Sequence, residues 1–428
     1  MTEEGGVLGR LARPLANRRF RWLLIAVALP LPLLQYLFVT AQLSADLVNR
    51  GYEDFWVYMR AGALILHGTD PYASTTTFVG QITTYTYPPL LAWVVQPLLT
   101  LNLTTQALIG FAVLQVCLFA AIVIITKALD ATWDLAALIT LAAITSYWVR
   151  RDLFEGQVDL VVLLMAAIWF WAWLRGGRWW GGVAIAIGAA VKVMPGVLVL
   201  LPLARRHWRM VAGAAGAGAV IFLLQPSLNF EYATRVLPHL PGVVGDPENQ
   251  SPAAALLRLF QRSALYGRPD GLGAWFHTLV VAVTLVFVGI TAWRLRRGHT
   301  DRESLAVEGA AAVALLPLLT PVTWGHHLVI DLLPLYVLGW LAIRRRHVWL
   351  GLLALVAWVL ANPVHLLFMA AYLGGVKTPV VMDVWVELPV AGVILIWGLC
   401  LFAYEPTQKP AMSGNKEDRL TTLRAERR

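Results

Sequence analysis

The sequence alternates between long apolar runs and short clusters of arginine, and this alternation limits the possible folds more than any other feature. Apolar residues make up 58% of the 428 residues and charged residues 14%, with a mean hydropathy of +0.66. A soluble globular domain carries roughly 45–50% apolar and about 25% charged residues. This composition excludes a soluble cytoplasmic enzyme and a disordered or fibrous protein. It predicts an all-α, polytopic membrane protein.

The apolar runs predict about twelve membrane-spanning segments, since a spanning helix takes about 20 residues. Several runs are shorter, which suggests tilted or broken helices around an internal cavity. A run at 88–101 is expected to lie along or dip into the interface, and a hinge is expected at Lys192–Pro195. The expected spans are 22–43, 104–126, 135–149, 158–174, 179–191, 193–204, 210–225, 275–293, 304–319, 327–343, 348–361 and 384–403.

The arginine clusters predict the topology. Arginines precede the first span and follow most of the runs that return inward, and such clusters mark the cytoplasmic face. We therefore expect a protein of the plasma (inner) membrane with both termini in the cytoplasm: a segment 1–21, a transmembrane domain 22–404 and a mobile basic tail 405–428. The first span is expected to be retained. The net charge of +9 then reflects topology and not nucleic-acid binding. Among the arginine clusters, Arg150–Arg151 is the exception that falls on the outer side, which indicates either an error in the topology or a functional site.

Five separated polar segments fall on the outer face in this topology. Ionisable groups at membrane depth are costly and usually mark a pathway or a site. Their convergence on one leaflet predicts a functional site there. The segments are Asp54, Arg150–Asp159, Lys192, Asn249–Ser251 and His326–His327.

The first outer loop begins with a predicted helix of about twelve residues, from Asp54 to a stop at Gly68. Trp56, Met59 and Leu64 form an apolar side, so the helix is expected to lie in the membrane interface. Asp54 has two interpretations on spacing alone. It is either an N-cap or a carboxylate at the lip of a lipid-facing cavity, where it can act as a general base.

The charged groups of the next two segments also leave alternatives open. Glu155 and Asp159 are four residues apart and would share a face of one helix. Their cluster either neutralises itself at a helix end, or Arg150, Arg151 or Lys192 clamps a phosphate. Lys192 lies in an apolar stretch and needs an anion. Either it snorkels to the headgroups or it binds a lipid phosphate.

A metal or redox cofactor is not expected. His326 and His327 are adjacent and cannot face the same way on a helix, so a two-histidine metal site is not indicated. One histidine that lines a cavity and donates to a phosphate or hydroxyl is the favoured interpretation. The two cysteines, Cys117 and Cys400, lie in apolar runs and support neither a disulfide nor a metal site.

Seven short motifs, in chain order over about residues 50–330, resemble glycosyltransferase family 87. This family contains polyprenyl-phosphate-sugar-dependent transferases of the GT-C class, among them actinobacterial α-1,2-mannosyltransferases of phosphatidylinositol mannoside and lipomannan assembly. Asp159 departs from the family pattern, in which asparagine is frequent. The motifs are Asp54-Phe55…Val57-Tyr58, His67-Gly68…Asp70-Pro71-Tyr72, Tyr87-Pro88-Pro89, Gly156-Gln157, Lys192…Pro195, Asn249-Gln250-Ser251 and Pro321…Trp324…His326-His327.

The resemblance implies a GT-C-type fold and the transfer of a hexose, with mannose favoured by the histidine pair. The donor would be a polyprenyl-phosphate sugar and the acceptor a glycolipid or lipoglycan hydroxyl at the outer face. Asp54 would deprotonate the acceptor for one inverting displacement, without a metal or cofactor. Groups implied to stabilise the phosphate or to contact substrate are Lys192, His326, His327, Arg150, Arg151, Tyr58, Arg60, Glu155, Gln157, Asn249 and Gln250.

Three other functions are alternatives to hexose transfer. A secondary transporter of a polar or anionic substrate would also use broken helices and buried charges, but the sequence shows no clear two-half repeat. A non-catalytic scaffold would not explain so many charged residues at membrane depth. Arabinofuranosyl or other pentosyl transfer by the same fold is the third. The sequence specifies neither the acceptor nor the oligomeric state.

Overall fold

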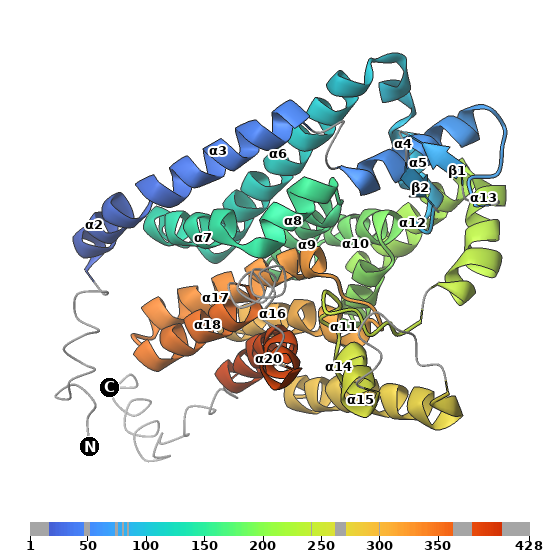
Figure 1. The fold of residues 1–428 in the computed structure, drawn as a ribbon. Coiled ribbons are helices and arrows are strands. Elements are labelled where there is room, and N and C mark those ends of the chain that lie inside the picture. The colour runs from blue at the N-terminus through green and yellow to red at the C-terminus, as the bar shows by residue number, and fades with distance from the viewer. Residues whose placement is uncertain are drawn as a thin grey trace, which may run out of the picture.

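The computed structural model of this chain is built almost entirely of helices (Figure 1). It describes residues 17–46, 52–72, 76–78, 81–83, 85–240, 242–261, 271–298, 300–362 and 379–404. Within these ranges one antiparallel hairpin joins β1 (Thr76–Phe78) to β2 (Gln81–Thr83). The predicted all-α class is confirmed. The predicted tail 405–428 and most of the segment 1–21 lie outside the described residues.

The first half of the chain forms two long helices along one edge, a cluster of short helices at one end, and central helices between them (Figure 1). Its helical segments are α2 (Arg18–Ala28), α3 (Pro30–Asp46), α4 (Glu53–Leu66), α5 (Pro89–Val94), η2 (Gln96–Thr100), α6 (Leu103–Leu129), α7 (Trp133–Thr145), α8 (Tyr147–Glu155), α9 (Asp159–Leu174) and α10 (Trp179–Val191).

The second half continues the same pattern of long helices separated by short or broken ones. Its segments are η3 (Met194–Val199), α11 (Leu200–Ala204), α12 (Trp208–Leu224), α13 (Pro226–Glu231), η4 (Tyr232–Val236), η5 (Leu237–His239), α14 (Pro252–Phe260), α15 (Gly273–Leu295), α16 (Arg302–Leu319), η7 (Gly325–Asp331), α17 (Leu332–Arg344), α18 (Val348–Ala361) and α20 (Pro379–Ala403).

Four helical stretches among the described residues are long and apolar enough to cross a membrane: Leu103–Leu129, Gly273–Leu295, Gly325–Arg344 and Val386–Ala403. Two bent pairs raise this number to six, with bends of 44° in Arg18–Ala28 plus Pro30–Gln42 and 110° in Trp208–Leu224 plus Pro226–His239. The other apolar helices have 10–17 residues. A polytopic membrane architecture therefore fits the fold, and about twelve crossings stay a prediction.

Several predicted boundaries agree closely with the helices, and one does not. The predicted 179–191 coincides with α10, and the hinge at Lys192 is confirmed, since Lys192 has extended backbone and a 3₁₀ segment follows. The predicted single run 135–149 is wrong. Ser146 interrupts it with extended backbone, and its Oγ accepts a hydrogen bond from the Val149 amide. A serine that caps a new helix is a strong local signal for a break.

The central helix α9 determines where the site lies. It packs against α6, α10, α16 and η7, and its Trp169, Phe170 and Trp173 are fully buried. Because η7 and the C-terminal end of α10 lie beside this helix, the first residue of α9, Asp159, is close to segments that are distant in sequence.

Glycines let α10 and α12 pack closely. A Cβ built on Gly182 would lie 1.9 Å from the Met210 carbonyl oxygen, and one on Gly213 would lie 2.1 Å from the carbonyl oxygen of Trp179. Small residues at such contacts allow helix backbones to approach in a membrane. This packing joins α12 to the N-terminal part of α10.

The helix α4 differs from its prediction in two respects. Its N-cap is Tyr52, with a left-handed φ of 70°, and Asp54 lies in the first turn, so the N-cap interpretation of Asp54 is wrong. The residues from Phe55 to Gly62 are all buried, so Trp56 and Met59 pack inside the protein and not along a membrane surface. The Tyr52 amide donates to the Phe154 carbonyl at 2.8 Å, which ties the start of α4 to α8.

Candidate active site

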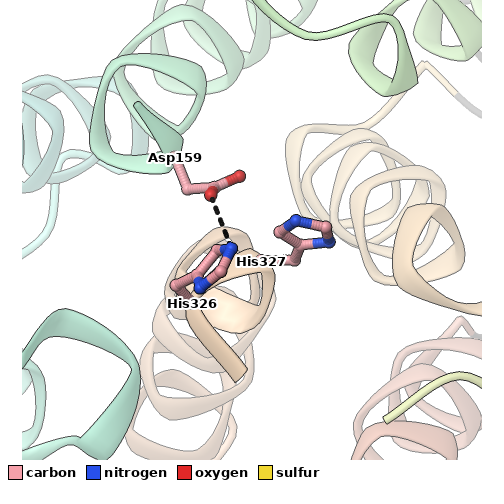
Figure 2. Close-up of side chains that lie close together, drawn as sticks. All are labelled: Asp159, His326 and His327. Carbon is pink, nitrogen blue, oxygen red and sulfur yellow. Dashed lines mark ion pairs between the residues drawn. The ribbon is translucent and has the colours of Figure 1, made fainter. Parts of the chain in front are cut away.

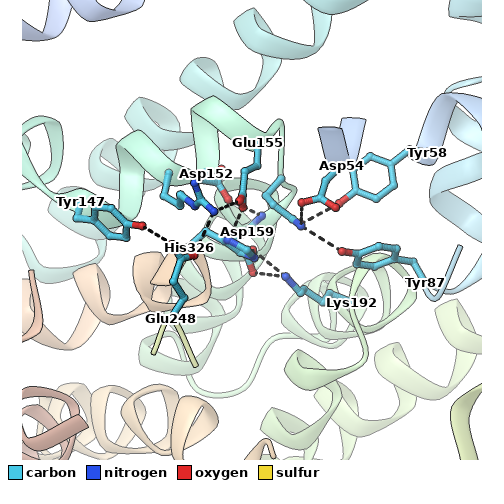
Figure 3. A network of polar contacts seen from close by, with 12 residues as sticks. Asp54, Tyr58, Tyr87, Tyr147, Asp152, Glu155, Asp159, Lys192, Glu248 and His326 are labelled. Carbon is cyan, nitrogen blue, oxygen red and sulfur yellow. Dashed lines mark hydrogen bonds and ion pairs between the residues drawn. The ribbon is translucent and has the colours of Figure 1, made fainter. Parts of the chain in front are cut away.

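The junction between α8 and α9 brings the predicted polar segments together (Figure 3). Helix α8 ends at Glu155, and Gly156 follows with a φ of +69°. Glycine adopts this conformation without strain. A Cβ on Gly156 would also lie 2.7 Å from the Tyr52 ring. The prediction that Glu155 and Asp159 share one helix face is therefore wrong, because the chain reverses its helical path between them.

Asp54 lies at one side of this junction, partly exposed and held by an amide. Gln157 Nε2 donates to Asp54 Oδ2 at 2.6 Å. The same nitrogen lies 3.1 Å from the Tyr87 hydroxyl, and the Tyr58 hydroxyl donates to Gln157 Oε1 at 2.9 Å. Burial, and then the nearby charge of Glu155, raises the pKa of Asp54 to about 6. A carboxylate with such a pKa is suited to act as a general base near neutral pH.

A buried ion pair lies on the other side of the junction. Lys192 Nζ is 2.8 Å from Asp159 Oδ2 and 3.0 Å from Oδ1. The side chains are 13% and 2% exposed. The anion that Lys192 was expected to need is therefore a carboxylate of the protein. The ammonium group has three N–H donors, so one remains for a further ligand.

Several charged side chains lie around His326. Its Nδ1 is 2.7 Å from Glu155 Oε2, and its Nε2 is 4.0 Å from Asp159 Oδ2. Arg151 contacts both Glu155, at 2.6 Å, and Glu248, at 3.1 Å. Burial is the main cause that raises the pKa of both glutamates. Their protonated forms would reduce the negative charge around a bound anion.

The segment that contains Asn249 and Gln250 is fastened to the loop that precedes His326. The Asn249 side chain donates to the Val244 and Pro321 carbonyls and accepts from the Thr323 amide at 2.8 Å. The Gln250 amide donates to the Thr323 carbonyl at 2.6 Å. Asn249 is fully buried, so its side chain is a brace for this loop.

His327 completes a set of three potential metal ligands. One ligand atom each from Asp159, His326 and His327 lies within 4.8 Å of the others (Figure 2). The Lys192 ammonium already contacts both oxygens of the Asp159 carboxylate. A divalent cation there would face a neighbouring positive charge, so these residues fit a metal poorly.

The structure brings some of the predicted site residues together in one region and places others elsewhere on the same helices. Asp54, Tyr58, Glu155, Gln157, Lys192 and His326 lie in one connected region with Arg151 (Figure 3). Arg60 is buried in α4, and Arg150 is half-buried on α8. The predicted roles of both arginines stay predictions.

The sequence analysis missed Glu248 and underrated Tyr87. Glu248 contacts Arg151, and the Tyr147 hydroxyl lies 3.5 Å from Glu248 Oε1. Glu248 directly precedes the Asn249–Ser251 motif, which was the available signal. The sequence indicates Tyr87 only as part of the motif Tyr87-Pro88-Pro89. Its hydrogen bond to Gln157 depends on tertiary contacts across 70 positions.

An apolar groove of about 330 Å³ opens beside the same loop. It lies between α14, α15 and the end of α16, and it ends at Thr320 and Pro321. Pro321 accepts hydrogen bonds from Asn249 and Ser251. The groove therefore adjoins the brace that leads to His326.

Known proteins resemble this chain over most of its length. A polyprenol-phosphate-mannose-dependent alpha-(1-2)-phosphatidylinositol mannoside mannosyltransferase of Mycobacterium tuberculosis is 29% identical over 73% of this chain and 77% of its own. Its namesake in Mycolicibacterium smegmatis is 30% identical, over 69% and 71%. An alpha-(1->3)-arabinofuranosyltransferase of Corynebacterium glutamicum is 29% identical over 38% of this chain and 37% of its own.

The chain is also similar to a solved structure of ArnT from Cupriavidus metallidurans bound to undecaprenyl phosphate. Its TM-score is 0.40 at 13% identity, covering 87% of this chain and 77% of that one. The sequence pattern of glycosyltransferase family 87 matches residues 85–321. Since this match spans more than half of the chain, the resemblance seen in the short motifs is confirmed. The chain is a multi-pass membrane protein that belongs to glycosyltransferase family 87.

Proposed function

We propose that this protein transfers mannose from a polyprenyl-phosphate-mannose donor to a hydroxyl of a glycolipid or lipoglycan. One observation carries the proposal. Within the short segment 157–159, Gln157 holds the carboxylate of Asp54 and Asp159 holds the ammonium of Lys192. A potential base and a potential phosphate-binding cation are therefore anchored on the two sides of one short segment, an arrangement that suits attack on an anomeric carbon from the side opposite the phosphate.

The reaction balances with groups of this chain. Asp54 Oδ1 takes the proton of the acceptor hydroxyl, and the acceptor oxygen forms a bond to the anomeric carbon from the side opposite the phosphate. The bond from the anomeric carbon to the phosphate oxygen breaks, and its electron pair stays on the lipid phosphate. Lys192, with its third N–H, and His326 stabilise that charge. One displacement inverts the configuration.

Mannose is preferred over arabinofuranose because the mannosyltransferases are more similar in sequence over a comparable share of the chain. The two mannosyltransferases match about seven tenths of this chain at 29–30% identity. An arabinofuranosyltransferase of Mycobacterium tuberculosis matches a similar share at 24% identity. Arabinofuranosyl transfer is the second candidate, supported by these relatives.

The lipid part of the donor requires an apolar surface beside the residues proposed to bind its phosphate. The apolar groove beside Pro321 opens between helices at the same end as His326. We propose that it holds the prenyl chain, which would place the phosphate near Lys192. By the arginine distribution, we also propose that the reaction takes place at the outer face and that both termini are cytoplasmic.

The test uses the full-length protein purified in detergent or liposomes. It is incubated with polyprenyl-phosphate-[¹⁴C]mannose or polyprenyl-phosphate-[¹⁴C]arabinose and a phosphatidylinositol mannoside acceptor, and the lipids are separated by thin-layer chromatography. We expect label from mannose in a slower-migrating lipid, and none with the Asp54→Asn variant. Transfer from arabinose alone would support the second candidate. Absence of transfer from either donor, to this acceptor and to lipomannan, would contradict the proposal.

A further inference from the structure

Gln157 joins three side chains from two other parts of the chain. Its amide contacts Asp54 and Tyr58 from α4 and Tyr87 from the segment before α5. Asp54 and Tyr58 are four residues apart, so they lie on one face of their helix. Gln157 itself is 2% exposed, and its backbone amide donates to the Asp152 carbonyl at 2.9 Å. The side-chain amide of Gln157 is therefore fixed in place between α4 and the segment before α5.

The chemistry of these partners determines which way the amide faces. An ionised carboxylate only accepts hydrogen bonds, so the NH₂ group of Gln157 must point at Asp54. Oε1 then faces Tyr58, whose hydroxyl donates to it. The Tyr58 and Tyr87 rings contact edge to face, with centroids 5.1 Å apart, which limits movement of both phenols. The Asp54 carboxylate thus sets the orientation of the Gln157 amide, and the Tyr58 hydroxyl gives Oε1 a hydrogen-bond donor in that orientation.

The two carboxylate oxygens of Asp54 differ in their hydrogen bonding. Oδ2 accepts from Gln157 at 2.6 Å, while Oδ1 makes no hydrogen bond among the residues that the structure describes. The side chain is partly exposed. The oxygen that is free of the amide is therefore the one available to a ligand.

We propose that Gln157 is a positioning residue that, with its Oε1 held by the Tyr58 hydroxyl, holds Oδ2 of Asp54 so that Oδ1 meets the acceptor hydroxyl. This inference rests on the proposed function, in which Asp54 is the base. Gln157 acts through Asp54 and does not itself touch the reacting atoms. The sequence predicts that Gln157 contacts substrate directly, whereas in this proposal it acts on the reaction through Asp54.

The charged groups around Asp54 give the inference a second readout. Glu155 and Glu53 raise its pKa, whereas the hydrogen bond from Gln157 and the charge of Lys192 lower it. Loss of the amide removes a donor to the ionised form. The pH at which activity rises should therefore move upward when Gln157 is replaced, and a carboxylate at position 157 should move it further.

The experiment measures kcat, KM and their pH dependence for transfer from the donor established above. Variants are Gln157→Leu, Gln157→Glu and Tyr58→Phe. Because a misplaced group can cost on the order of 10²-fold in rate, we expect kcat to fall about 10–100-fold in Gln157→Leu, with donor KM changed less than threefold. The rise of activity should move to higher pH, most in Gln157→Glu. Tyr58→Phe should show a smaller loss in the same direction.

Two matched controls separate this role from general destabilisation. Gln106→Leu removes a buried glutamine whose amide donates to the Leu101 carbonyl. Tyr336→Phe removes a buried hydroxyl that contacts Thr126. Both should keep the wild-type pH profile even where the melting temperature falls. If the Gln157 variants keep kcat and pH profile while Asp54→Asn loses transfer, the positioning role is wrong and the proposed function stands. Unimpaired transfer by Asp54→Asn would instead contradict the base on which both rest.

Discussion

Lys192 and Asp159 form a bidentate ion pair, with Nζ 2.8 and 3.0 Å from the two carboxylate oxygens, at the junction where α9 begins and α10 ends. The Asp159 carboxylate gives Lys192 a partner before any phosphate arrives. The donor must therefore use the remaining N–H of the ammonium or displace Asp159.

The first prediction separates the charge of Lys192 from its effect on folding. Lys192→Met leaves Asp159 buried without a counterion, which costs about 3–5 kcal/mol of stability. The double variant Lys192→Met, Asp159→Asn should recover most of the lost melting temperature. Its KM for the donor should nevertheless rise at least tenfold, because the charge-assisted contact to the phosphate is absent. Lys192→Arg should retain part of the affinity.

A donor KM in the stable double variant equal to that of the wild type would show that Lys192 serves the ion pair alone. The Asp159→Asn single variant is the internal control, since it keeps the ammonium and removes only the competing carboxylate. Its donor KM should be no higher than that of the wild type.

The second prediction concerns the base. Asp54→Asn should lower kcat about 10²–10⁴-fold, the usual contribution of general base catalysis. The fold should survive, because the cap of α4 is Tyr52 and not Asp54. Glu53→Gln changes the adjacent, exposed carboxylate and should leave kcat within about twofold, since exposed substitutions rarely matter.

Sugar transfer and thermal unfolding of the two purified variants are measured together. Near-normal turnover of Asp54→Asn would move the search for a base to Glu155 or His326, which contact each other at 2.7 Å.

The third prediction is a pH dependence. The pKa of Asp54 is raised to about 6, chiefly by burial, so its base form is present above this pH and lost below it. The ratio kcat/KM should therefore be low under acid conditions and rise through about pH 6. The measurement is a profile from pH 4.5 to 8.5 with a check that the protein stays folded at each end. A flat profile across this range would be inconsistent with Asp54 as the base.

The fourth prediction tests topology in intact cells with a membrane-impermeant thiol reagent. Gly242→Cys should react, because the position is exposed and a Cβ there meets nothing within 4 Å. Arg346→Cys, in the cluster after α17, should react only after the cells are permeabilised. The native Cys117 and Cys400 are buried, so background labelling should be low. The opposite pattern would reverse the orientation and place the site at the inner face.

Much of the helical architecture was predictable from the order of residues. Apolar runs between charged clusters predicted α6, α10, α12 and α15 within a few residues, because a membrane helix satisfies its backbone within one segment. The hinge at Lys192 followed from a lysine and a proline at the end of such a run. These features are local, so a single sequence contains them.

The local predictions that were wrong concern features that depend on a few atoms. Ser146 divides a run whose hydropathy is continuous, and Gly156 separates two carboxylates whose spacing suggests one helix. Asp54 has the chemistry of an N-cap, but Tyr52 occupies that position because its amide binds the carbonyl of Phe154. Hydropathy averages over many residues and does not register such single contacts.

The identities of the site residues were set by sequence, and their relationships were set by tertiary structure. Asp54, Lys192 and the histidine pair stood out because ionisable groups are costly at membrane depth. That Gln157 contacts Asp54 follows only from the packing of α4 against α8, and that Asp159 pairs with Lys192 follows only from the packing of α9 against α10. Hydrogen bonds and ion pairs act over about 3 Å, so residues far apart in the chain acquire such roles only when the fold brings them together.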